Sequence, residues 1–307
     1  MRIHDCLNAP APKTIASRQI PVILNGGHSS DEAQVLRQAF NEAGLEAKLL
    51  PFRSGGDMRE LARRAMEEGP PVLVAAGGDG TVSAVADAVR GTGTALGVIP
   101  VGTLNHFAKD LGIPLDPREA ARTIAAGRRT RVDVGEVNGR AFVNNASLGL
   151  YADMVRKRER QQRRFRRSKR TAMLWATLAV LHRSRLLDLR LELEDGVQEC
   201  RAPFVFVGNS RYVMEGFDIG KRERLDDGIL SVYTTRRCGA GGLLGLALRA
   251  LLGRLRQAED FVESSVRSLR VESRSRQLLV ATDGEVSAMQ TPLEFRIRPR
   301  ALEVVVP

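Results

Sequence analysis

Apolar runs alternate with helix-forming stretches along the first part of the chain. The apolar runs predict buried strands at 19–25, 46–52, 71–78 and 95–102. The stretches between and after them, bounded by capping residues and glycines, predict helices at 29–44, 57–69, 81–91, 104–112 and 116–127. Strands that alternate with helices in this way predict βαβ units, and so a doubly wound α/β domain with a parallel sheet over 19–130.

The pattern changes after Gly127. Asn138-Gly139 predicts a two-residue hairpin turn, and the runs that follow are short, rich in β-formers and punctuated by turn residues. These runs cover 187–196, 202–210, 228–236, 268–273, 277–285, 293–299 and 301–307. They predict a β-rich antiparallel domain, a sandwich or a barrel, over 131–307, with the option that the last strand returns to the first domain.

Composition adds limits to this picture. The 307 residues suffice for two domains, and residues 1–18 carry prolines and charges, which predicts a loose tail. No apolar run reaches the roughly 18 to 20 residues of a membrane-spanning helix. The three cysteines are too scattered for a disulfide framework, which predicts reduced thiols and a cytoplasmic protein; they are Cys6, Cys200 and Cys238.

Most of the net charge of +11 lies in one segment, 156–170, where ten residues are Arg or Lys and one is acidic. Such a segment can face nucleic-acid phosphates or anionic lipid head groups, or it can be a solvated surface. Phe165 is its only aromatic residue, which argues against stacking on single-stranded nucleic acid. Its position just before the apolar stretch 173–181 favours a membrane surface.

A glycine-rich turn follows the predicted strand at 71–78. In doubly wound sheets, ligands bind at the carboxyl ends of strands, and glycines there leave backbone N–H groups accessible to a phosphate. The turn consists of Gly77, Gly78, Asp79, Gly80 and Thr81, and the carboxylate suits a Mg²⁺ ion beside a phosphate. A plain tight turn is the alternative.

A second glycine turn follows the neighbouring predicted strand. Gly102, Thr103 and Asn105 lie where this strand gives way to the next predicted helix, and this edge of the sheet is shared with the first turn. Thr103 and Asn105 could donate hydrogen bonds to a nucleotide, although Thr103 could equally cap the helix.

Four motifs in order, GGDGT (77–81), PVGTLNHFAKDLGIP (100–114), LDDGIL (225–230) and TDGE (282–285), resemble the diacylglycerol kinase catalytic family. The resemblance is greatest to its soluble bacterial branch, which is related to sphingosine kinases and more distantly to NAD kinases. It implies transfer of the γ-phosphate of ATP to a lipid hydroxyl with Mg²⁺, in a cleft between an α/β nucleotide domain and a β-rich domain. Diacylglycerol or a related glycerolipid is the implied acceptor.

The resemblance also implies roles for individual residues. The GGDGT turn and Thr103 would hold the nucleotide, and Asn25 matches the asparagine of the family's first turn, although the usual proline after it is absent. Asp227 would bind a structural Mg²⁺ with backbone oxygens near Arg224 and Ile229; an ordinary turn is the alternative.

The TDGE motif supplies the implied general base. Glu285 is the first candidate to accept the hydroxyl proton, and Asp283 is the second, as base or orienting partner. Without the other motifs, a polar β-turn at Asp283-Gly284 would explain the same residues.

One departure from the family lies after GGDGT, where Ser83 and Ala84 replace the usual Asn-Glu. It leaves open a non-catalytic relative that binds nucleotide or lipid, and a kinase for a sphingoid base or NAD is a further alternative. The favoured hypothesis is a cytoplasmic lipid kinase that binds reversibly to an anionic membrane through 156–170, with 173–181 and 243–255 either at the lipid or in the core. No nucleic-acid partner is expected, and a homodimer is the candidate assembly.

Overall fold

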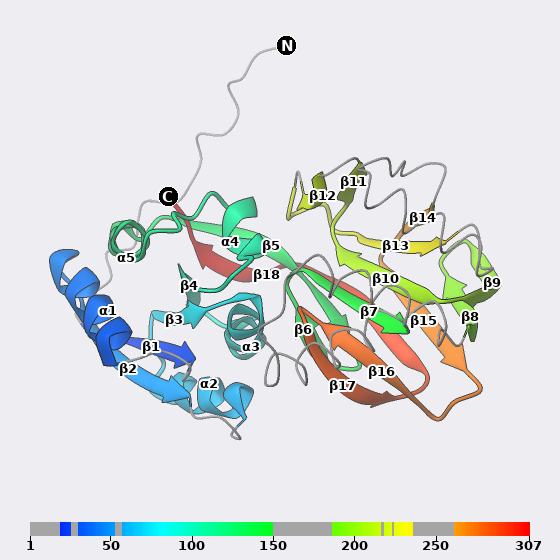
Figure 1. The fold of residues 1–307 in the computed structure, drawn as a ribbon, viewed down its shortest axis with the longest axis horizontal. Coiled ribbons are helices and arrows are strands. Elements are labelled where there is room, and N and C mark those ends of the chain that lie inside the picture. The colour runs from blue at the N-terminus through cyan, green and yellow to red at the C-terminus, as the bar shows by residue number, and fades with distance from the viewer. Residues whose placement is uncertain are drawn as a thin grey trace, which may run out of the picture. The chain divides into compact units, whose positions relative to one another are not determined.

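The computed structural model describes residues 19–25, 30–52, 57–149, 186–215, 218–222, 224–235 and 261–307. They form two compact units (Figure 1). Unit 1 comprises the described residues up to Arg131 together with Leu302–Pro307, and unit 2 comprises those within Val132–Ala301. The tail at 1–18, the basic segment at 156–170 and the apolar segments at 173–181 and 243–255 lie outside the described residues.

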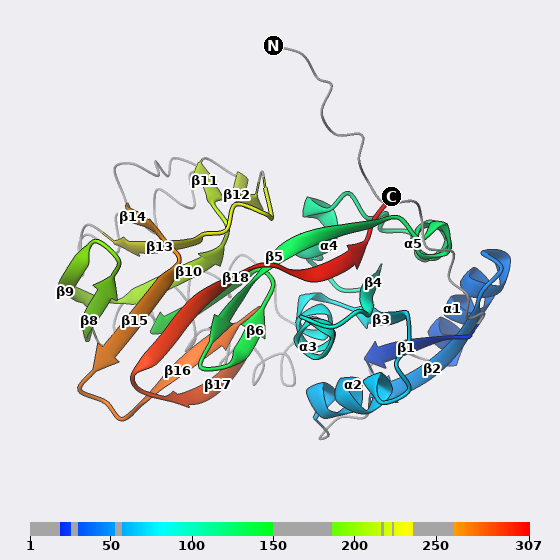
Figure 2. The same ribbon diagram turned by 180° about the vertical axis from the view of Figure 1, so that it is seen from behind.

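Unit 1 has the doubly wound α/β fold that the sequence predicts. Its elements are β1 (Gln19–Asn25), α1 (Ser30–Glu42), β2 (Glu46–Phe52), α2 (Met58–Met66), β3 (Val72–Gly77), α3 (Asp79–Val89), β4 (Ala95–Pro100), α4 (His106–Asp110) and α5 (Pro117–Ala126). The strands pair in parallel in the order β2-β1-β3-β4. Helix α1 packs with α5 and α2 with α3, and Figures 1 and 2 show these pairs on opposite sides of the sheet.

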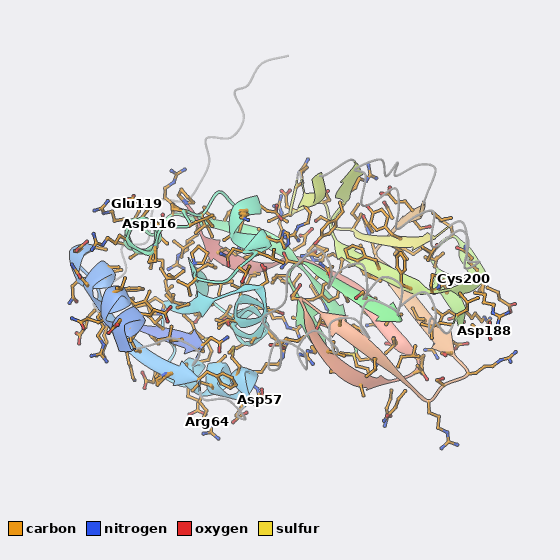
Figure 3. The ribbon with its side chains drawn as sticks, in the orientation of Figure 1. Asp57, Arg64, Asp116, Glu119, Asp188 and Cys200 are labelled. Carbon is orange, nitrogen blue, oxygen red and sulfur yellow. The ribbon has the colours of Figure 1, made fainter. Side chains whose placement is uncertain are left out.

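The ends of the helices in unit 1 follow from local capping. Asp57 accepts a hydrogen bond from the N–H of Arg59 and begins α2, and Asp116 does the same for two N–H groups at the start of α5 (Figure 3). Helix α3 begins at Asp79, two residues before the predicted start. Because of this shift, Asp79 lies in the first turn, where a negative charge is favourable to the helix dipole.

The C-terminal residues complete the sheet of unit 1. The strand β18 (Leu293–Val305) ends beside β4, where Val304 pairs in parallel with Leu96. Leu302 and Val304 are fully buried. Arg129 forms an ion pair with Glu303, with 3.0 Å between Nη1 and Oε2. The last residues of the chain therefore belong to the core of the first unit.

Unit 2 is an antiparallel β-sandwich. Its strands are β5 (Arg129–Val137, which begins in unit 1), β6 (Arg140–Phe142), β7 (Asn145–Gly149), β8 (Leu187–Leu193), β9 (Gly196–Ala202), β10 (Phe204–Asn209), β11 (Tyr212–Glu215), β12 (Asp218–Arg222), β13 (Leu230–Thr235), β14 (Phe261–Val266), β15 (Ser268–Ser273), β16 (Gln277–Thr282), β17 (Glu285–Gln290) and most of β18. One sheet has the order β14-β13-β10-β7-β16-β17. In the other, β9, β8, β15 and β18 follow one another, and β18 also pairs with β5, which pairs with β6.

Buried side chains from both sheets of unit 2 form one hydrophobic core. Val207, Val232 and Val280 come from the first sheet, and Val271 and Phe295 from the second. The two sheets therefore pack face to face, which confirms the predicted sandwich class and excludes a single closed barrel for the described strands.

The predicted strands at 293–299 and 301–307 are wrong as separate elements, because β18 runs through Pro299. Arg300 takes a left-handed conformation (φ 51°), and its N–H donates to the Asp133 carboxylate at 2.8 Å. This bond replaces a ladder hydrogen bond, so the strand continues past a residue that usually ends one. The predicted hairpin at Asn138-Gly139 is confirmed, with positive φ at both residues.

Among the described residues, none of the helices is both long and apolar enough to cross a membrane.

Leu302→Ala tests whether the C-terminal strand supports unit 1. The substitution leaves a cavity beside the parallel sheet, so we expect the free energy of unfolding to fall by about 2 to 5 kcal/mol. Leu115→Ala is the matched control, because Leu115 is an exposed leucine of the same unit and its truncation should cost less than about 0.5 kcal/mol. Urea unfolding followed by circular dichroism measures both, and equal effects would contradict the placement of Leu302 in the core.

Candidate functional site

Three strand ends meet at the carboxyl edge of the parallel sheet in unit 1. The register pairs Leu24 with Ala76 and Gly77 with Pro100, so the ends of β1, β3 and β4 lie side by side. The chain runs outward from β1 to β2 and then returns to β3 on the other side of β1. In doubly wound sheets, such a reversal opens a crevice that binds ligands. The predicted residue Asn25 and both predicted turns lie at this edge.

The two glycine turns touch through their backbones. A Cβ built on Gly102 would lie 2.3 Å from the Cα of Gly78, a distance that no real side chain tolerates. A Cβ on Gly77 would lie 2.3 Å from Oγ1 of Thr81. Glycine is therefore required at 77 and 102 for packing, and the contact brings the two turns together.

Asp79 joins the second turn to the first. Its carboxylate oxygens accept hydrogen bonds from the N–H groups of His106 and Phe107, at 3.3 and 3.2 Å. These are donors at the start of α4, which have no partner within their own helix. The sequence predicts Asp79 beside a phosphate-bound Mg²⁺; in the structure its carboxylate holds α4, and the role with a metal stays a prediction.

Asn105 shapes the second turn from within. It takes a left-handed conformation (φ 52°), its Oδ1 accepts the N–H of Gly102 at 3.1 Å, and its Nδ2 donates to the Gly102 carbonyl at 2.9 Å. The side chain is buried and its hydrogen bonds are made within the turn. Thr81 is buried as well, whereas Thr103 is exposed. In this part of unit 1, Thr103 and the half-exposed Gly78 and Gly80 are accessible to a ligand.

Ser83 and Ala84, which depart from the family pattern, are buried in α3. Their positions therefore pack inward, and neither side chain is offered to solvent beside the GGDGT turn. A weaker nucleotide contact as a result of this departure stays a prediction.

In unit 2, Asp283 binds a neighbouring loop. It is 8% exposed, and its carboxylate accepts hydrogen bonds from three successive backbone N–H groups, those of Val143, Asn144 and Asn145, at 2.7, 2.8 and 3.0 Å. Successive N–H groups that converge on one anion form a nest, which stabilises negative charge. Asp283 takes a left-handed conformation (φ 48°) that turns the chain between β16 and β17.

Glu285 differs from Asp283 in both exposure and partner. Its side chain is 42% exposed, and its Oε2 lies 2.8 Å from Nη2 of Arg140 at the start of β6. The carboxylate is therefore accessible to a substrate while it is held by a guanidinium group. Of the two candidate bases, Glu285 is the accessible one, and Asp283 is buried and anchors the loop at 143–145.

Asp133 is a functional candidate that the sequence reasoning missed. It is fully buried on β5, and its carboxylate accepts the N–H of Gly228 at 2.6 Å and that of Arg300 at 2.8 Å. Its own N–H donates to the carbonyl of Leu225. These bonds hold the LDDG turn against β5 and β18. The signal in the sequence is an aspartate between two valines just before the predicted hairpin turn at Asn138-Gly139, because a charge buried among apolar residues needs partners.

The predicted metal residues lie together at the LDDG turn. Nε of Arg224 is 3.0 Å from Oδ1 of Asp227, and its Nη2 is 3.2 Å from Oδ1 of Asp226. The hydrogen bond with Asp226 and the charges of both carboxylates raise the pKa of the Arg224 guanidinium. The carbonyl of Ile229 accepts the N–H of Ser210 at 3.1 Å.

The predicted ligands suit Mg²⁺ chemically. The carboxylate of Asp227 and the backbone carbonyls of Arg224 and Ile229 all offer oxygen atoms, and they lie on a partly exposed turn. The guanidinium of Arg224 now carries the positive charge beside Asp227. Within the described part of the chain, no group of three or more His, Cys, Asp or Glu side chains is placed to hold a metal ion.

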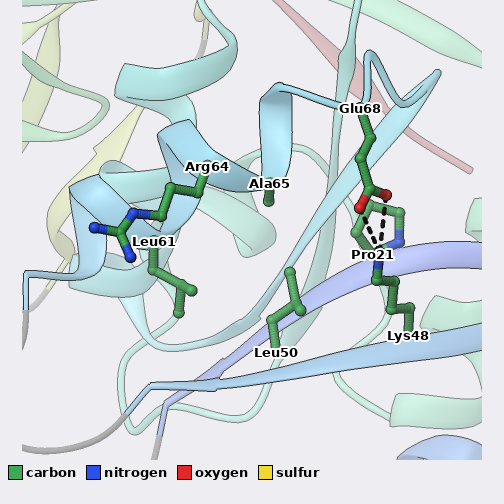
Figure 4. A pocket seen from close by; sticks show the side chains of 7 residues that line it. All are labelled: Pro21, Lys48, Leu50, Leu61, Arg64, Ala65 and Glu68. Carbon is green, nitrogen blue, oxygen red and sulfur yellow. Dashed lines mark hydrogen bonds and ion pairs between the residues drawn. The ribbon is translucent and has the colours of Figure 1, made fainter.

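A small cavity of about 130 Å³ lies elsewhere in unit 1, between α2 and the strands β1 and β2 (Figure 4). Leu50 and Leu61 line it, and the ion pair between Lys48 and Glu68 borders it, with 2.6 Å between Nζ and Oε1. None of the predicted site residues lines this cavity.

Two family models match the chain. Residues 19–137 match the diacylglycerol kinase catalytic domain, and residues 146–306 match the YegS C-terminal NAD kinase beta sandwich-like domain. Together they cover nearly all of the described residues of both units.

Curated relatives and a solved structure are similar over most of their length. A protein of Pseudomonas aeruginosa strain PAO1, named as a YegS-like lipid kinase, is 32% identical over 295 residues, 94% of either chain. A diacylglycerol kinase of Staphylococcus aureus strain RF122 is 28% identical and covers 87% of this chain and 84% of its own. The structure of a diacylglycerol kinase from Bacillus anthracis strain Sterne has the same fold, with a TM-score of 0.67 at 19% identity, over 94% of this chain and 97% of that one.

Gly102→Ala tests the contact between the two glycine turns. The new methyl group would meet backbone atoms of Gly78, so we expect the free energy of unfolding to fall by about 1 to 3 kcal/mol and nucleotide binding to weaken. Gly93→Ala is the control, because a Cβ there has nothing within 4 Å. Thermal unfolding and titration with a fluorescent ATP analogue measure the two effects; a Gly102→Ala protein that behaves like Gly93→Ala would contradict the contact.

Comparing Asp283→Asn with Glu285→Gln tests whether Asp283 is a structural anchor and Glu285 an accessible carboxylate. The amide introduced by Asp283→Asn has one acceptor oxygen and no charge for three N–H donors, so we expect a loss of about 3 kcal/mol in the free energy of unfolding. Glu285→Gln removes the charge from a partly exposed ion pair with Arg140 and should cost less, about 1 kcal/mol. Urea denaturation compares them, and the reverse order of stabilities would show that the roles are exchanged.

Proposed function

The chain belongs to the diacylglycerol kinase catalytic family, and from that premise we propose that it transfers the γ-phosphate of ATP to the hydroxyl of a lipid, most directly diacylglycerol or a related glycerolipid. The family match supports the kinase chemistry and the use of a nucleotide. The names of the P. aeruginosa and S. aureus relatives support a lipid acceptor. The observation that carries the proposal is the pair of glycine turns held together at the carboxyl edge of the parallel sheet.

We propose that the phosphates of ATP bind at the amino end of α3. This helix has 11 residues, its first N–H groups have no partner within the helix, and its dipole places partial positive charge there. Gly78 and Gly80 are accessible and carry no side chain that would block a phosphate. Thr103 can add a hydrogen bond from its exposed hydroxyl, and Asn25 lies at the neighbouring strand end.

In this proposal Glu285 is the general base. Its carboxylate accepts the proton of the lipid hydroxyl, the hydroxyl oxygen forms a bond to the γ-phosphorus, and the bond from that phosphorus to the bridging oxygen of ADP breaks. A base must be accessible and within hydrogen-bond distance of the proton. Glu285 meets the first condition, whereas Asp283 is buried and its oxygens already accept hydrogen bonds from three backbone N–H groups.

The proposed metal site is the LDDG turn, where Asp227 and the backbone oxygens of Arg224 and Ile229 would hold Mg²⁺. Bound there, the ion would supply a fixed positive charge that stabilises the turn. The side chain of Arg224 would then exchange its contact with Asp227 for one with solvent. Asp133 supports the same turn through Gly228, whether or not a metal binds.

Access to a lipid is proposed to come from the basic segment 156–170, which is outside the described residues. Each Lys or Arg near an anionic lipid surface contributes about 1 kcal/mol of binding free energy, so ten of them suffice for reversible attachment. The proposal places the protein in the cytoplasm at the inner face of the membrane, with a homodimer as its candidate assembly.

Phosphate transfer from ATP labelled at the γ-position tests the function. The purified protein is incubated with Mg²⁺ and vesicles that contain diacylglycerol, a sphingoid base or a total lipid extract. We expect labelled phosphatidic acid from the wild type and about 100-fold to 10,000-fold less from Glu285→Gln, since general bases contribute factors of this size. Glu303→Gln, a carboxylate in unit 1 that pairs with Arg129, is the matched control and should keep its activity.

Other outcomes of this assay have definite meanings. A labelled sphingoid base would show that the protein is a lipid kinase with a different acceptor from the one proposed. Bound ATP without any labelled lipid would favour a non-catalytic relative and contradict the proposal. Full activity in Glu285→Gln would overturn the assignment of the base.

A further inference from the structure

Arg140 contacts the proposed base, Glu285. One N–H of its guanidinium group donates to Oε2 of Glu285 at 2.8 Å, and the side chains are 24% and 42% exposed. A hydrogen bond between a guanidinium and a carboxylate is among the stronger ones in proteins. We propose that Arg140 is a positioning residue, which holds the Glu285 carboxylate in the orientation needed to accept the hydroxyl proton; this inference rests on the proposed function.

The backbones that carry the two residues are held at tight turns. Arg140 directly follows the Asn138-Gly139 turn and pairs with Val137, and Glu285 directly follows the Asp283-Gly284 turn and pairs with Thr282. Each residue is therefore part of the closing pair of a two-residue hairpin, where the backbone has little freedom.

Two further contacts set the separation of these hairpins. Asp283 accepts the N–H groups of Val143, Asn144 and Asn145, three to five residues after Arg140. At the other turn, Nδ2 of Asn138 donates to the carbonyl of Gln290, at the end of the strand that Glu285 begins, at 3.0 Å. The strands β6 and β17 are thus tied at both ends, and the contact between Arg140 and Glu285 spans a rigid frame.

Orientation matters here because a glutamate side chain has three rotatable bonds. A partly exposed carboxylate without a fixed partner distributes over several rotamers, and only some of them place an oxygen near the substrate hydroxyl. Misplacement by about 1 Å can lower a rate by about 100-fold. The planar guanidinium limits these rotamers more than the ammonium group of a lysine would.

The same contact should contribute little to folding. The pair is partly exposed, with Arg140 24% and Glu285 42% exposed, and such pairs add about 1 kcal/mol to the free energy of unfolding, so variants of Arg140 are expected to fold. A positioning role and a purely structural role therefore make different predictions. The first predicts a loss of kcat with unchanged stability, and the second predicts a loss of stability.

The test compares Arg140→Gln, Arg140→Lys, Glu285→Gln and the double variant in the full chain, with ATP, Mg²⁺ and diacylglycerol vesicles. We expect Arg140→Gln to lower kcat by about 10-fold to 100-fold, with the KM for ATP and the unfolding midpoint unchanged, and Arg140→Lys to restore part of the rate. In the Glu285→Gln background, Arg140→Gln should have no further effect, because the carboxylate that it orients is gone. Arg298→Gln is the matched control, since Arg298 forms an exposed ion pair with Glu136 in the same unit.

The outcomes separate this inference from the function on which it rests. A wild type without lipid phosphorylation overturns the proposed function and the inference with it. An active wild type with an impaired Glu285→Gln and a fully active Arg140→Gln overturns the inference alone. Equal losses from Arg140→Gln with and without Glu285, or a loss of the same size in Arg298→Gln, also overturn it.

Discussion

Aspartate carboxylates that accept backbone N–H groups hold the loops of this protein. Asp79 accepts two at the start of α4, Asp133 accepts those of Gly228 and Arg300, and Asp283 accepts three in a row. Loops lack the regular hydrogen bonds of helices and strands, so their N–H groups need other acceptors. A short carboxylate that accepts several of them sets the path of a loop more closely than apolar packing would. Each of these loops belongs to a sequence motif or touches one.

The need of loop N–H groups for acceptors divides the motif residues into two kinds: those that support a loop and those that stay accessible to a ligand. In GGDGT, Asp79 supports the start of α4, and Gly78 and Gly80 are half-exposed and carry no side chain. In TDGE, Asp283 supports, and Glu285 keeps an accessible carboxylate. The division has a physical reason, because a carboxylate that accepts several N–H groups is poorly placed to accept a proton as well. In the proposed mechanism, the proton is accepted by the neighbouring, partly exposed carboxylate of Glu285.

Phosphoryl transfer depends mainly on positioning and on charge neutralisation, and the observed contacts are suited to that demand. The backbone contact between Gly78 and Gly102 determines where the proposed phosphate turn lies. The frame around Asn138 and Asp283 determines where Arg140 and Glu285 lie. In the proposed mechanism, therefore, substitutions that loosen a turn should affect the rate as strongly as those that remove a reacting group.

The sequence alone determined the elements of unit 1 and the class of both units. Local signals suffice for these, because the apolar runs, the capping residues at 57 and 116 and the Asn138-Gly139 turn act within a few residues. The order of the four motifs likewise indicated the family. The strands β9, β11, β12, β14 and β17 were not predicted, because edge strands carry weak patterns that pairing with a neighbour decides.

Only the tertiary structure decided which motif residues hold a loop in place and which are accessible to a ligand. Asp283 and Glu285 are two positions apart in one motif, and nothing local separates an aspartate bound to the loop at 143–145 from a glutamate bound to Arg140. The same holds for Pro299. In the sequence it predicts the end of a strand, whereas in the structure the N–H of the next residue, Arg300, donates to Asp133 and the strand continues. These outcomes depend on contacts between residues that are more than 130 positions apart in the chain. Local propensity cannot encode such contacts, because their energies arise only once the sheets have packed.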